Sequence, residues 1–159
     1  MTSSESKDVT PESAAFWNLI GEERYPSSLM ANARFVGGSP GRIDCELDID
    51  SSMENAFRSM HGGAAATIID VVTSVAVTTT LPQEPPPSNT VSVSIELSLS
   101  FVKPIPIGST VICKGRVVRT GTSIAFSVGE IRLKSTDEIA VLGRHVLALR
   151  KETSMKPKL

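Results

Sequence analysis

The sequence predicts an α+β domain in which one long helix packs against a single face of an antiparallel sheet of five or six strands. The run at residues 61–80 contains no turn signal after its first residues and is too long for a typical strand. Segments that alternate polar and apolar residues lie on both sides of this run, which is the pattern of half-buried strands. Neither an internal repeat nor a change of composition marks a second domain.

The first segment with a helical pattern is TPESAAFWNLIGEER, residues 10–24. Its threonine cap and first-turn proline predict a short amphipathic helix after a disordered tail at residues 1–9. Residues 42–50 then alternate strictly between polar and apolar, which predicts a strand with one wet face. We expect this strand to pair antiparallel with residues 29–36 through the connection GGSPG.

The central run at residues 61–80 is rich in β-branched residues, which favour a strand by propensity. Its length and the helical spacing of its apolar residues favour a helix, and we give these two signals more weight. A buried central helix is therefore expected. The residues that recur at helical spacing are Ala65, Ile68, Val72, Val75 and Ala76. A second face carries Asp70 within a stripe of mostly small or polar residues, namely Ala66, Thr67, Thr73, Ser74 and Val77.

The clearest strand follows a proline-rich loop at residues 81–89. Residues 91–101 alternate apolar side chains with serine or glutamate throughout, so we expect all the apolar side chains of this strand to pack on one face. Three further strands are expected at about residues 109–119, 122–134 and 138–150, with turn signals at Gly121 and at STDE. The element order is therefore two strands, one helix and four strands.

Composition and charge exclude several classes of protein. A chain of 159 residues fits one domain, for which we expect residues 10–152, followed by a flexible tail at residues 153–159. A net charge of −1 gives no basic surface for a nucleic-acid backbone, so nucleic acid is not an expected partner. Cys45 and Cys113 have no second ligand at zinc spacing, so we expect buried free thiols and neither a metal nor a cofactor.

Nothing in the sequence has the pattern of a secretory signal or a membrane span, so we expect a soluble intracellular protein without membrane insertion. The last residues, Pro157, Lys158 and Leu159, are a variant of the peroxisomal address that is read at a free C-terminus. A frayed basic terminus explains the same three residues. Both a cytoplasmic and a peroxisomal location therefore stay open.

The candidate chemistry centres on HGG at the start of the predicted helix and on Asp70 within it. A helix N-terminus leaves backbone N–H groups unpaired and stabilises negative charge, so the amide of Gly62 or Gly63 could polarise a carbonyl oxygen. The two glycines could equally serve only the turn into the helix. Asp70 either faces solvent or meets a substrate groove or partner subunit, where it would act as general base or nucleophile.

Other catalytic patterns lack support. The sequence has no G-x-S-x-G motif, and a serine or cysteine triad would have to use His61 or His145 without a supporting motif. The stretch GGSPGR lacks the lysine of a phosphate-binding loop, and we interpret it as a turn.

Three stretches of the sequence together resemble one known family. The pattern N-x5-HGG-x6-D leads into the long helix, and VSVSIELSLSFVKPIPIG and RVVRTGTSIAFS follow it. Over about residues 35–150 this arrangement is similar to the hotdog-fold acyl-CoA thioesterases of the phenylacetate-thioesterase subfamily. The resemblance implies a curved antiparallel sheet wrapped around the central helix. It also implies hydrolysis of an acyl-CoA thioester to a free acid and coenzyme A, by a homodimer or homotetramer.

The resemblance assigns catalytic roles residue by residue. Asp70 would be the catalytic carboxylate, and the amide of Gly62 from another subunit would polarise the thioester carbonyl. Asn55 would position the thioester or the water, and Ser94 would help to orient the nucleophile. Ser94 lies on the polar face of its predicted strand, so it reaches Asp70 only if that face meets a partner subunit or the strand is bulged.

The resemblance also implies binding residues. His61 and Gly63 would shape the turn beside the substrate, without His61 acting as the base. Lys103 and Arg119 would meet the phosphates of coenzyme A, and the amides around Gly121 would form a small anion nest.

Two other functions stay open from the sequence. A hotdog hydratase or dehydratase would normally use a histidine and a carboxylate on the same helix, whereas this helix carries Asp70 and no internal histidine. A non-catalytic acyl-CoA-binding module on the same fold is the other alternative. The identity of the acyl group is not determined by any of these residues.

Overall fold

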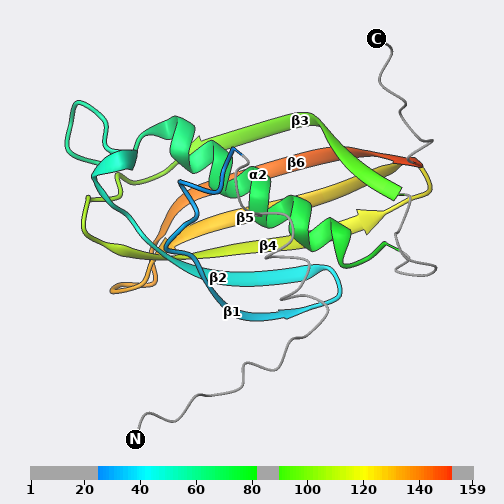
Figure 1. Ribbon diagram of the computed structural model, residues 1–159, viewed down its shortest axis with the longest axis horizontal. Coiled ribbons are helices and arrows are strands. Elements are labelled where there is room, and N and C mark those ends of the chain that lie inside the picture. The colour runs from blue at the N-terminus through cyan, green and yellow to red at the C-terminus, as the bar shows by residue number, and fades with distance from the viewer. Residues whose placement is uncertain (1–24, 82–89, 152–159) are drawn as a thin grey trace, which may run out of the picture.

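In the part of the chain that the structure describes, six antiparallel strands form one sheet around one long helix, as the sequence predicts (Figure 1). The computed structural model describes residues 25–81 and 90–151. The elements in chain order are β1 (Arg34–Ser39), β2 (Arg42–Asp48), the 3-10 helix η1 (Ser51–Met53), α2 (Gly62–Thr78), β3 (Thr90–Phe101), β4 (Thr110–Thr120), β5 (Ile124–Leu133) and β6 (Ile139–Lys151). The helix expected at residues 10–24, the proline-rich loop beyond Leu81 and both predicted tails lie outside the described residues.

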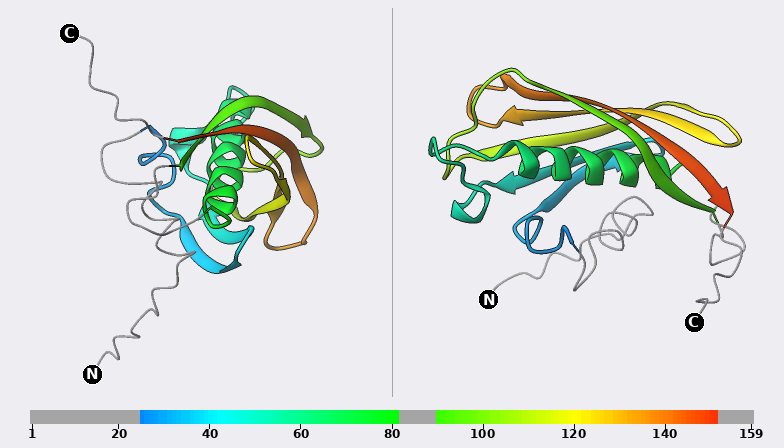
Figure 2. Two further views of the ribbon diagram at one scale, coloured as in Figure 1. Left: turned by 90° about the vertical axis from the view of Figure 1, so that its right-hand side faces the viewer. Right: turned by 90° about the horizontal axis from the view of Figure 1, so that it is seen from above.

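The strand order across the sheet is β1-β2-β4-β5-β6-β3, so β1 and β3 are the two edges. Figure 2 shows the sheet curving from β3 on one side of α2 to β1 and β2 on the other. The concave face of the sheet and the helix enclose the main hydrophobic core. The predicted α+β architecture with one covered sheet face is therefore confirmed, and β4, β5 and β6 lie within two residues of their expected positions.

Helix α2 confirms that length and spacing outweigh strand propensity in this run. All five residues expected at helical spacing, Ala65, Ile68, Val72, Val75 and Ala76, are buried against the sheet. The expected polar stripe is only partly correct. Thr73, Ser74 and Val77 are buried, whereas Ala66, Thr67 and Asp70 remain partly exposed. The reason is that the curved sheet covers more of the helix than a flat sheet would.

Three glycines let the helix approach the sheet closely. Gly115, Gly129 and Gly143 are paired across β4, β5 and β6, and all three face α2. A Cβ atom at Gly115 would lie 2.1 Å from the carbonyl oxygen of Val72, and one at Gly143 would lie 2.5 Å from Ile69 Cγ2. A Cβ atom does not fit at Gly115 or Gly143, and at Gly129 it would lie 3.0 Å from the side chains of Ile69 and Thr73, so the close packing depends on glycine in this row.

The antiparallel pairing of β1 and β2 is confirmed, but the predicted bounds of β1 are wrong. The strand begins at Arg34 rather than at residue 29, because the chain before it forms turns with a hydrogen bond from Met30 N to the carbonyl of Pro26. It continues through two glycines that we assigned to the connection, leaving only Pro40 and Gly41 between the strands. An edge strand tolerates glycine and a bulge. The alternation of polar and apolar residues in the sequence does not reveal either feature.

The alternation expected along β3 is wrong in its first half. Ser94 pairs with Leu147 and Glu96 with Val146, so Ile95 is an extra residue in a β-bulge. A bulge shifts the side-chain alternation by one residue and so reverses which side chains face the helix. Beyond the bulge, Leu97 and Leu99 pack on the core as expected. Before it, the exposed side chains are Val91 and Val93.

Candidate active site

Asp70 lies at the centre of a small polar cluster between α2 and the edge strand β3. Its side chain is 43% exposed, and Oδ1 accepts a hydrogen bond of 2.9 Å from Ser94 Oγ. The bulge at Ile95 is what turns Ser94 toward the helix. The structure therefore brings Asp70 and Ser94 together within one chain, although plain alternation places Ser94 on the face away from the core.

His145 on β6 is a member of this cluster that the sequence reasoning missed. Its imidazole is fully buried. Nδ1 lies 2.7 Å from Thr73 Oγ1, and Nε2 lies 3.4 Å from Asp70 Oδ1. The signal that could have found it is its place in the last strand, where it follows the inward alternation of Val141, Gly143 and Leu147. A histidine at such a position needs a polar partner inside the core.

The hydrogen bonds around Thr73 determine where the imidazole proton lies. The Thr73 hydroxyl donates to the carbonyl of Ile69 at 2.6 Å, so Thr73 Oγ1 accepts from His145 Nδ1. Neutral His145 then carries its proton on Nδ1 and presents a bare lone pair at Nε2. Nε2 has no hydrogen-bond partner within the described part of the chain. A proton taken up by Asp70 can therefore be shared with Nε2.

Burial keeps His145 in this neutral form. Desolvation lowers the pKa of the imidazole, and the negative charge of Asp70 opposes the shift without reversing it. The cluster thus consists of an accessible carboxylate, one hydroxyl donor and one buried acceptor. In this arrangement the neighbours hold the Asp70 carboxylate in place, and the carboxylate can accept one proton during a reaction.

The start of α2 offers one unpaired backbone donor. His61 is the N-cap, and its Nδ1 accepts a hydrogen bond of 2.9 Å from Gly63 N. The amide of Gly63 is therefore not available to a ligand, whereas no acceptor is found for the Gly62 amide among the described residues. Of the two glycines that the sequence left open, Gly62 is the candidate oxyanion donor. His61 shapes the helix start, as expected.

The side chain of Asn55 is used by the loop before α2. Its Oδ1 accepts from the amides of Phe57 and Ser59, and its Nδ2 donates to Ser59 Oγ at 3.0 Å and to the Met60 carbonyl at 3.4 Å. These bonds form a tight turn in which Arg58 has a φ of 60°. Asn55 therefore organises the chain that leads into the helix. Of the two Nδ2 hydrogens, the one in the long bond to the Met60 carbonyl is the one that could be donated to another acceptor instead.

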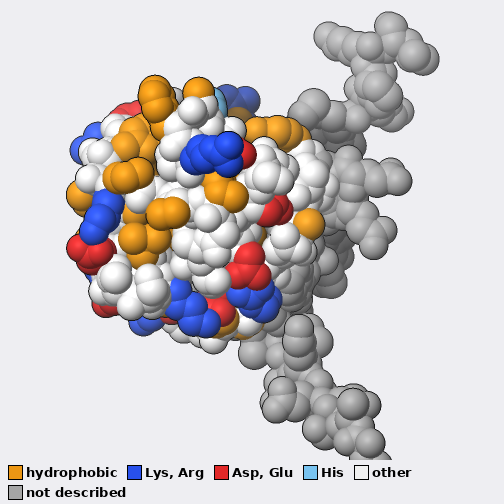
Figure 3. Space-filling model, turned by 90° about the vertical axis from the view of Figure 1, so that its left-hand side faces the viewer, with side chains coloured by type: hydrophobic (Ala, Val, Ile, Leu, Met, Phe, Trp, Pro, Cys, Tyr) orange, Lys and Arg blue, Asp and Glu red, His pale blue; other side chains and the backbone are white. Residues whose placement is uncertain are grey.

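A pocket of about 380 Å³ lies at the helix start and is lined by Asn55, Gly62, Phe101 and Lys103, among others. The ring of Phe101 covers Gly62, because a Cβ atom at Gly62 would lie 3.2 Å from Phe101 Cζ. Figure 3 shows this end of the molecule, where exposed hydrophobic side chains gather between separate charged groups. An apolar pocket beside an unpaired amide suits a ligand with a carbonyl and an acyl or pantetheine chain.

The pocket at the helix start and the Asp70 cluster are separate within one chain. Gly62 and Asp70 are eight residues apart on α2, which corresponds to about 12 Å along the helix axis and a different helix face. One carbonyl group cannot contact both residues of the same chain. Among the described residues, the edge strand β3, which carries Ser94, pairs on one side only, with β6. Asp70 therefore lies beside the unpaired edge of the sheet.

The three residues expected to bind coenzyme A phosphates do not come together in the chain. Lys103 follows β3 and forms an ion pair of 2.5 Å with Glu138, whereas Arg119 lies near the far end of β4. Arg119 has no ion-pair partner in the described part of the chain. The Gly121 amide donates to the Ile124 carbonyl at 2.9 Å, so this N–H cannot belong to an anion nest.

Cys45 and Cys113 are free, buried and paired across β2 and β4, which confirms the expected buried thiols. Within residues 25–81 and 90–151, no three His, Cys, Asp or Glu side chains come close enough to hold a metal ion. No helix in the same residues is long and apolar enough to cross a membrane.

Comparison with known proteins relates this chain to one enzyme family. A family model described as the thioesterase superfamily matches residues 57–140. Human acyl-coenzyme A thioesterase 13 is 25% identical over 117 residues, which cover 74% of this chain and 79% of the relative.

Solved structures show the same fold. Zebrafish thioesterase superfamily member 2 has a TM-score of 0.76 at 19% identity and covers 89% of this chain and 99% of its own. A Streptococcus mutans protein solved with bound acetyl-CoA has a TM-score of 0.67 at 16% identity and covers 76% and 90%. At these identities the likeness shows the hotdog fold, with the helix inside the curved sheet, and not the substrate.

Proposed function

Because this chain belongs to the thioesterase superfamily, we propose that it hydrolyses acyl-CoA thioesters to a free acid and coenzyme A. The observation that carries the proposal is the carboxylate of Asp70, held by Ser94 at 2.9 Å beside the bare nitrogen of His145. The human relative is named an acyl-CoA thioesterase, and the Streptococcus mutans structure contains acetyl-CoA. Both are consistent with a substrate of this class.

In the proposed reaction, Asp70 takes a proton from water while the water oxygen attacks the thioester carbonyl carbon. The negative charge that develops on the carbonyl oxygen is stabilised by the Gly62 amide and by the positive end of the α2 dipole. Collapse of the tetrahedral intermediate breaks the C–S bond, and the departing thiolate takes up a proton. Direct attack by Asp70, through an anhydride, is the alternative route that the same residues allow.

The site is proposed to contain two subunits. Gly62 and Asp70 of one chain are too far apart to act on one carbonyl, and Asp70 lies beside the unpaired sheet edge. Pairing of two such edges in a homodimer would place the helix start of one chain near the Asp70 cluster of the other. A homotetramer made of two such dimers has the same sites.

The remaining candidate residues have supporting roles in this proposal. Ser94 orients Asp70, while His61 and Gly63 fix the helix start that presents the Gly62 amide. Asn55 holds the loop before the helix. In the proposal, the Nδ2 hydrogen that Asn55 donates to the Met60 carbonyl in this structure positions the thioester or water.

The phosphates of coenzyme A are proposed to meet Lys103 and Arg119. These two residues lie at opposite ends of the sheet in one chain, so both can contact one nucleotide only if they come from different subunits. Arg119 is the more available cation, because Glu138 already pairs with Lys103. The backbone around Gly121 contributes less than the sequence indicates, since its own amide is used in the hairpin.

A hydratase or dehydratase is the second candidate, and one observation bears on it directly. The structure supplies the histidine that the helix lacks, since His145 on β6 lies beside Asp70. However, its imidazole is fully buried and its free nitrogen faces Asp70, so it cannot reach a substrate carbon. The pair therefore fits a supported carboxylate better than a two-residue acid and base.

The proposed function is tested by assaying short, long and aryl acyl-CoAs for released thiol. We expect turnover of at least one acyl class and no requirement for added metal. Conversion of an enoyl-CoA without thiol release would support the hydratase and overturn the proposal. Saturable binding of acyl-CoA with no product of either kind would instead indicate a non-catalytic binding module.

The two-subunit site predicts that two inactive variants restore each other. Gly62→Pro removes the candidate donor but keeps the helix, because proline suits the first helical position and His61 before it is extended. When Gly62→Pro and Asp70→Asn chains are refolded together at equal amounts, half of the dimers are mixed. Each mixed dimer has one intact site, so about a quarter of wild-type activity should return.

The matched control for this experiment is Gly62→Ala, which adds a Cβ atom but keeps the amide. Both substitutions place the same Cβ atom against Phe101, so the extra loss in Gly62→Pro reports the missing N–H donor together with the rest of the proline ring. Activity of the refolded mixture that stays at the sum of the two variants would show that each site lies within one chain. The oligomeric state, measured by light scattering, must be at least a dimer.

A further inference from the structure

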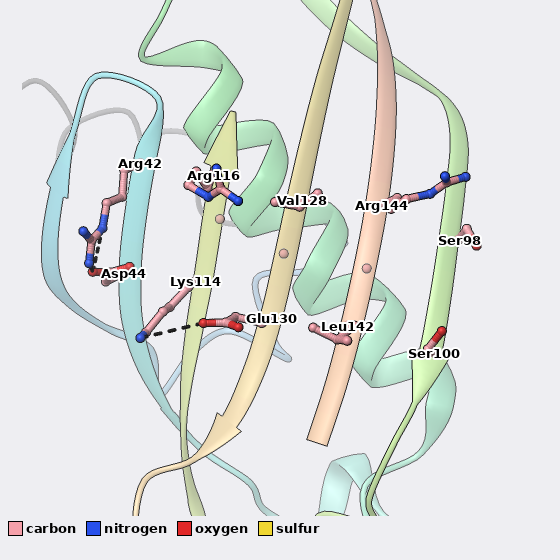
Figure 4. Close-up of a pocket in the computed structure, with 13 residues that line it drawn as sticks. Arg42, Asp44, Ser98, Ser100, Lys114, Arg116, Val128, Glu130, Leu142 and Arg144 are labelled. Carbon is pink, nitrogen blue, oxygen red and sulfur yellow. Dashed lines mark hydrogen bonds and ion pairs between the residues drawn. The ribbon is translucent and has the colours of Figure 1, made fainter. Parts of the chain in front are cut away.

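The outer face of the sheet contains a groove of about 670 Å³, on the side away from α2 (Figure 4). Its floor is the backbone of the glycine row, Gly115, Gly129 and Gly143. These glycines let the sheet sink toward the helix, so the outer surface is hollow where the inner surface is tightest. The groove thus follows from the same packing that builds the core.

Two arginines flank the groove at one level. Arg116 on β4 and Arg144 on β6 both pair with Val128 on β5, so their Cα atoms are two strand spacings, or about 10 Å, apart. Figure 4 shows the two side chains on either side of Val128. Side chains as long as arginine can converge on one group across this distance, and their planar forks suit a carboxylate or phosphate.

Most charges that line the groove have partners, and Arg116 is the least neutralised of them. Asp44 pairs with Arg42 at 2.6 Å, and Glu130 is shared between Arg132 at 2.9 Å and Lys114 at 3.8 Å. Arg144 reaches only Glu96, at 3.2 Å, and its side chain is 73% exposed. The side chain of Arg116 has no ion pair or hydrogen bond to any residue that the structure describes. The end of the groove around Arg116 and Arg144 is therefore cationic.

The floor beside this cationic end is apolar. Val128 lies between the arginines, and Leu142 lies in the next level of the groove with 42% of its surface exposed. Ser98 and Ser100 on the edge strand β3 line one side of the groove and supply hydroxyl groups. An inorganic anion would leave the apolar floor uncovered, and an uncharged hydrocarbon would leave the arginines unpaired.

We propose that this groove binds an amphipathic organic anion, with its carboxylate or phosphate between Arg116 and Arg144 and its apolar body over Val128 and Leu142. The site is on the opposite face of the sheet from Asp70, so its ligand does not take part in the proposed hydrolysis. Binding in this groove depends on its shape and charge and does not require that the chain hydrolyse a thioester.

The test is calorimetric titration of the full chain with four probes: octanoate, octyl phosphate, octanol and inorganic phosphate. At least one octyl anion should bind at least about tenfold more tightly than octanol and inorganic phosphate, because only it satisfies both parts of the groove. A preference between the two anions identifies the head group. Equal binding of octanol and octanoate would overturn the proposal.

Variants place the binding site. Replacing both Arg116 and Arg144 by glutamine should weaken binding of the octyl anion at least about tenfold. Arg150→Gln, which removes an exposed cation on β6 outside the groove lining, should leave binding unchanged. Unchanged binding in the double variant overturns the proposal.

Amide chemical shifts separate this site from the helix-start pocket. Addition of the octyl anion should move the amide signals of Gly115, Gly129 and Gly143. Shifts confined to Gly62 and its neighbours would mean that the anion occupies the pocket at the helix start and would overturn the proposal. A second outcome would also overturn the proposal. If the octyl anion did not bind and the double arginine variant formed a smaller oligomer, the groove would be a contact between copies of this chain.

Discussion

Replacing Asp70 by asparagine is expected to lower the turnover of acyl-CoA thioesters at least about a hundredfold while the fold stays intact. Asparagine has the same shape and can still contact Ser94, but it cannot take a proton from water or attack a carbonyl. The side chain of Asp70 is 43% exposed, so replacing it by asparagine leaves no buried charge without a partner. Steady-state kinetics by thiol release measures the loss, and thermal unfolding checks the fold.

Asp137→Asn is the matched control for this substitution. Asp137 is an exposed carboxylate in the turn between β5 and β6, with a φ of 57° that asparagine also accepts. Its replacement should leave turnover unchanged. If Asp70→Asn retained more than about a tenth of wild-type turnover, Asp70 would be neither the base nor the nucleophile. Ser94→Ala should cause a smaller loss, because Ser94 orients the carboxylate and does not react.

Gly115→Ala is expected to lower the free energy of unfolding by about 3 kcal/mol or more, or to prevent folding. The added Cβ atom would lie 2.1 Å from the carbonyl oxygen of Val72 and 2.5 Å from its carbonyl carbon. Both atoms belong to the backbone of α2, so a change of rotamer cannot relieve the clash. The helix itself has to move away from the sheet, which opens the core on both sides.

Gly37→Ala is the control for the loss of a glycine in a strand of the same sheet. A Cβ atom at Gly37 meets nothing within 4 Å, and the φ of Gly37 is not in the left-handed region. The free energy of unfolding of Gly37→Ala should therefore differ from wild type by no more than about 0.5 kcal/mol. Urea unfolding of both variants compares the two positions. A Gly115→Ala protein as stable as Gly37→Ala would show that the helix does not rest on the glycine row.

Local patterns in the sequence predicted most of the fold. The twenty-residue run without a breaker became α2, and the two segments expected before it and the four expected after it became strands, because periodicity and turn residues act within one element. The start of β1 was misplaced, since the turns around Met30 and the glycines of an edge strand have no distinctive local pattern. The glycine row was not recognised, because its members come from three different strands.

The candidate site was predictable in part. The family resemblance assigned roles to Asp70, Gly62 and Ser94. In the structure Ser94 Oγ donates a hydrogen bond to Asp70, and the Gly62 amide has no acceptor among the described residues. His145 was missed because it meets Asp70 only when β6 pairs beside β3 under the helix. A nest made by the amides around Gly121 stays a prediction, although a hairpin hydrogen bond uses the amide of Gly121 itself and hairpin register is not visible in composition.

The sequence by itself determined the order of the elements, the central helix and the position of the carboxylate on it. Each of these depends on residues that are neighbours in the chain. Only the tertiary structure decided which face of β3 meets the helix, which histidine lies beside Asp70 and where the sheet is hollow. A single inserted residue, Ile95, reverses the first of these, and the other two depend on contacts between strands that are far apart in sequence. Such contacts follow from packing the whole sheet around the helix, because side-chain direction and close approach are properties of the assembled layers.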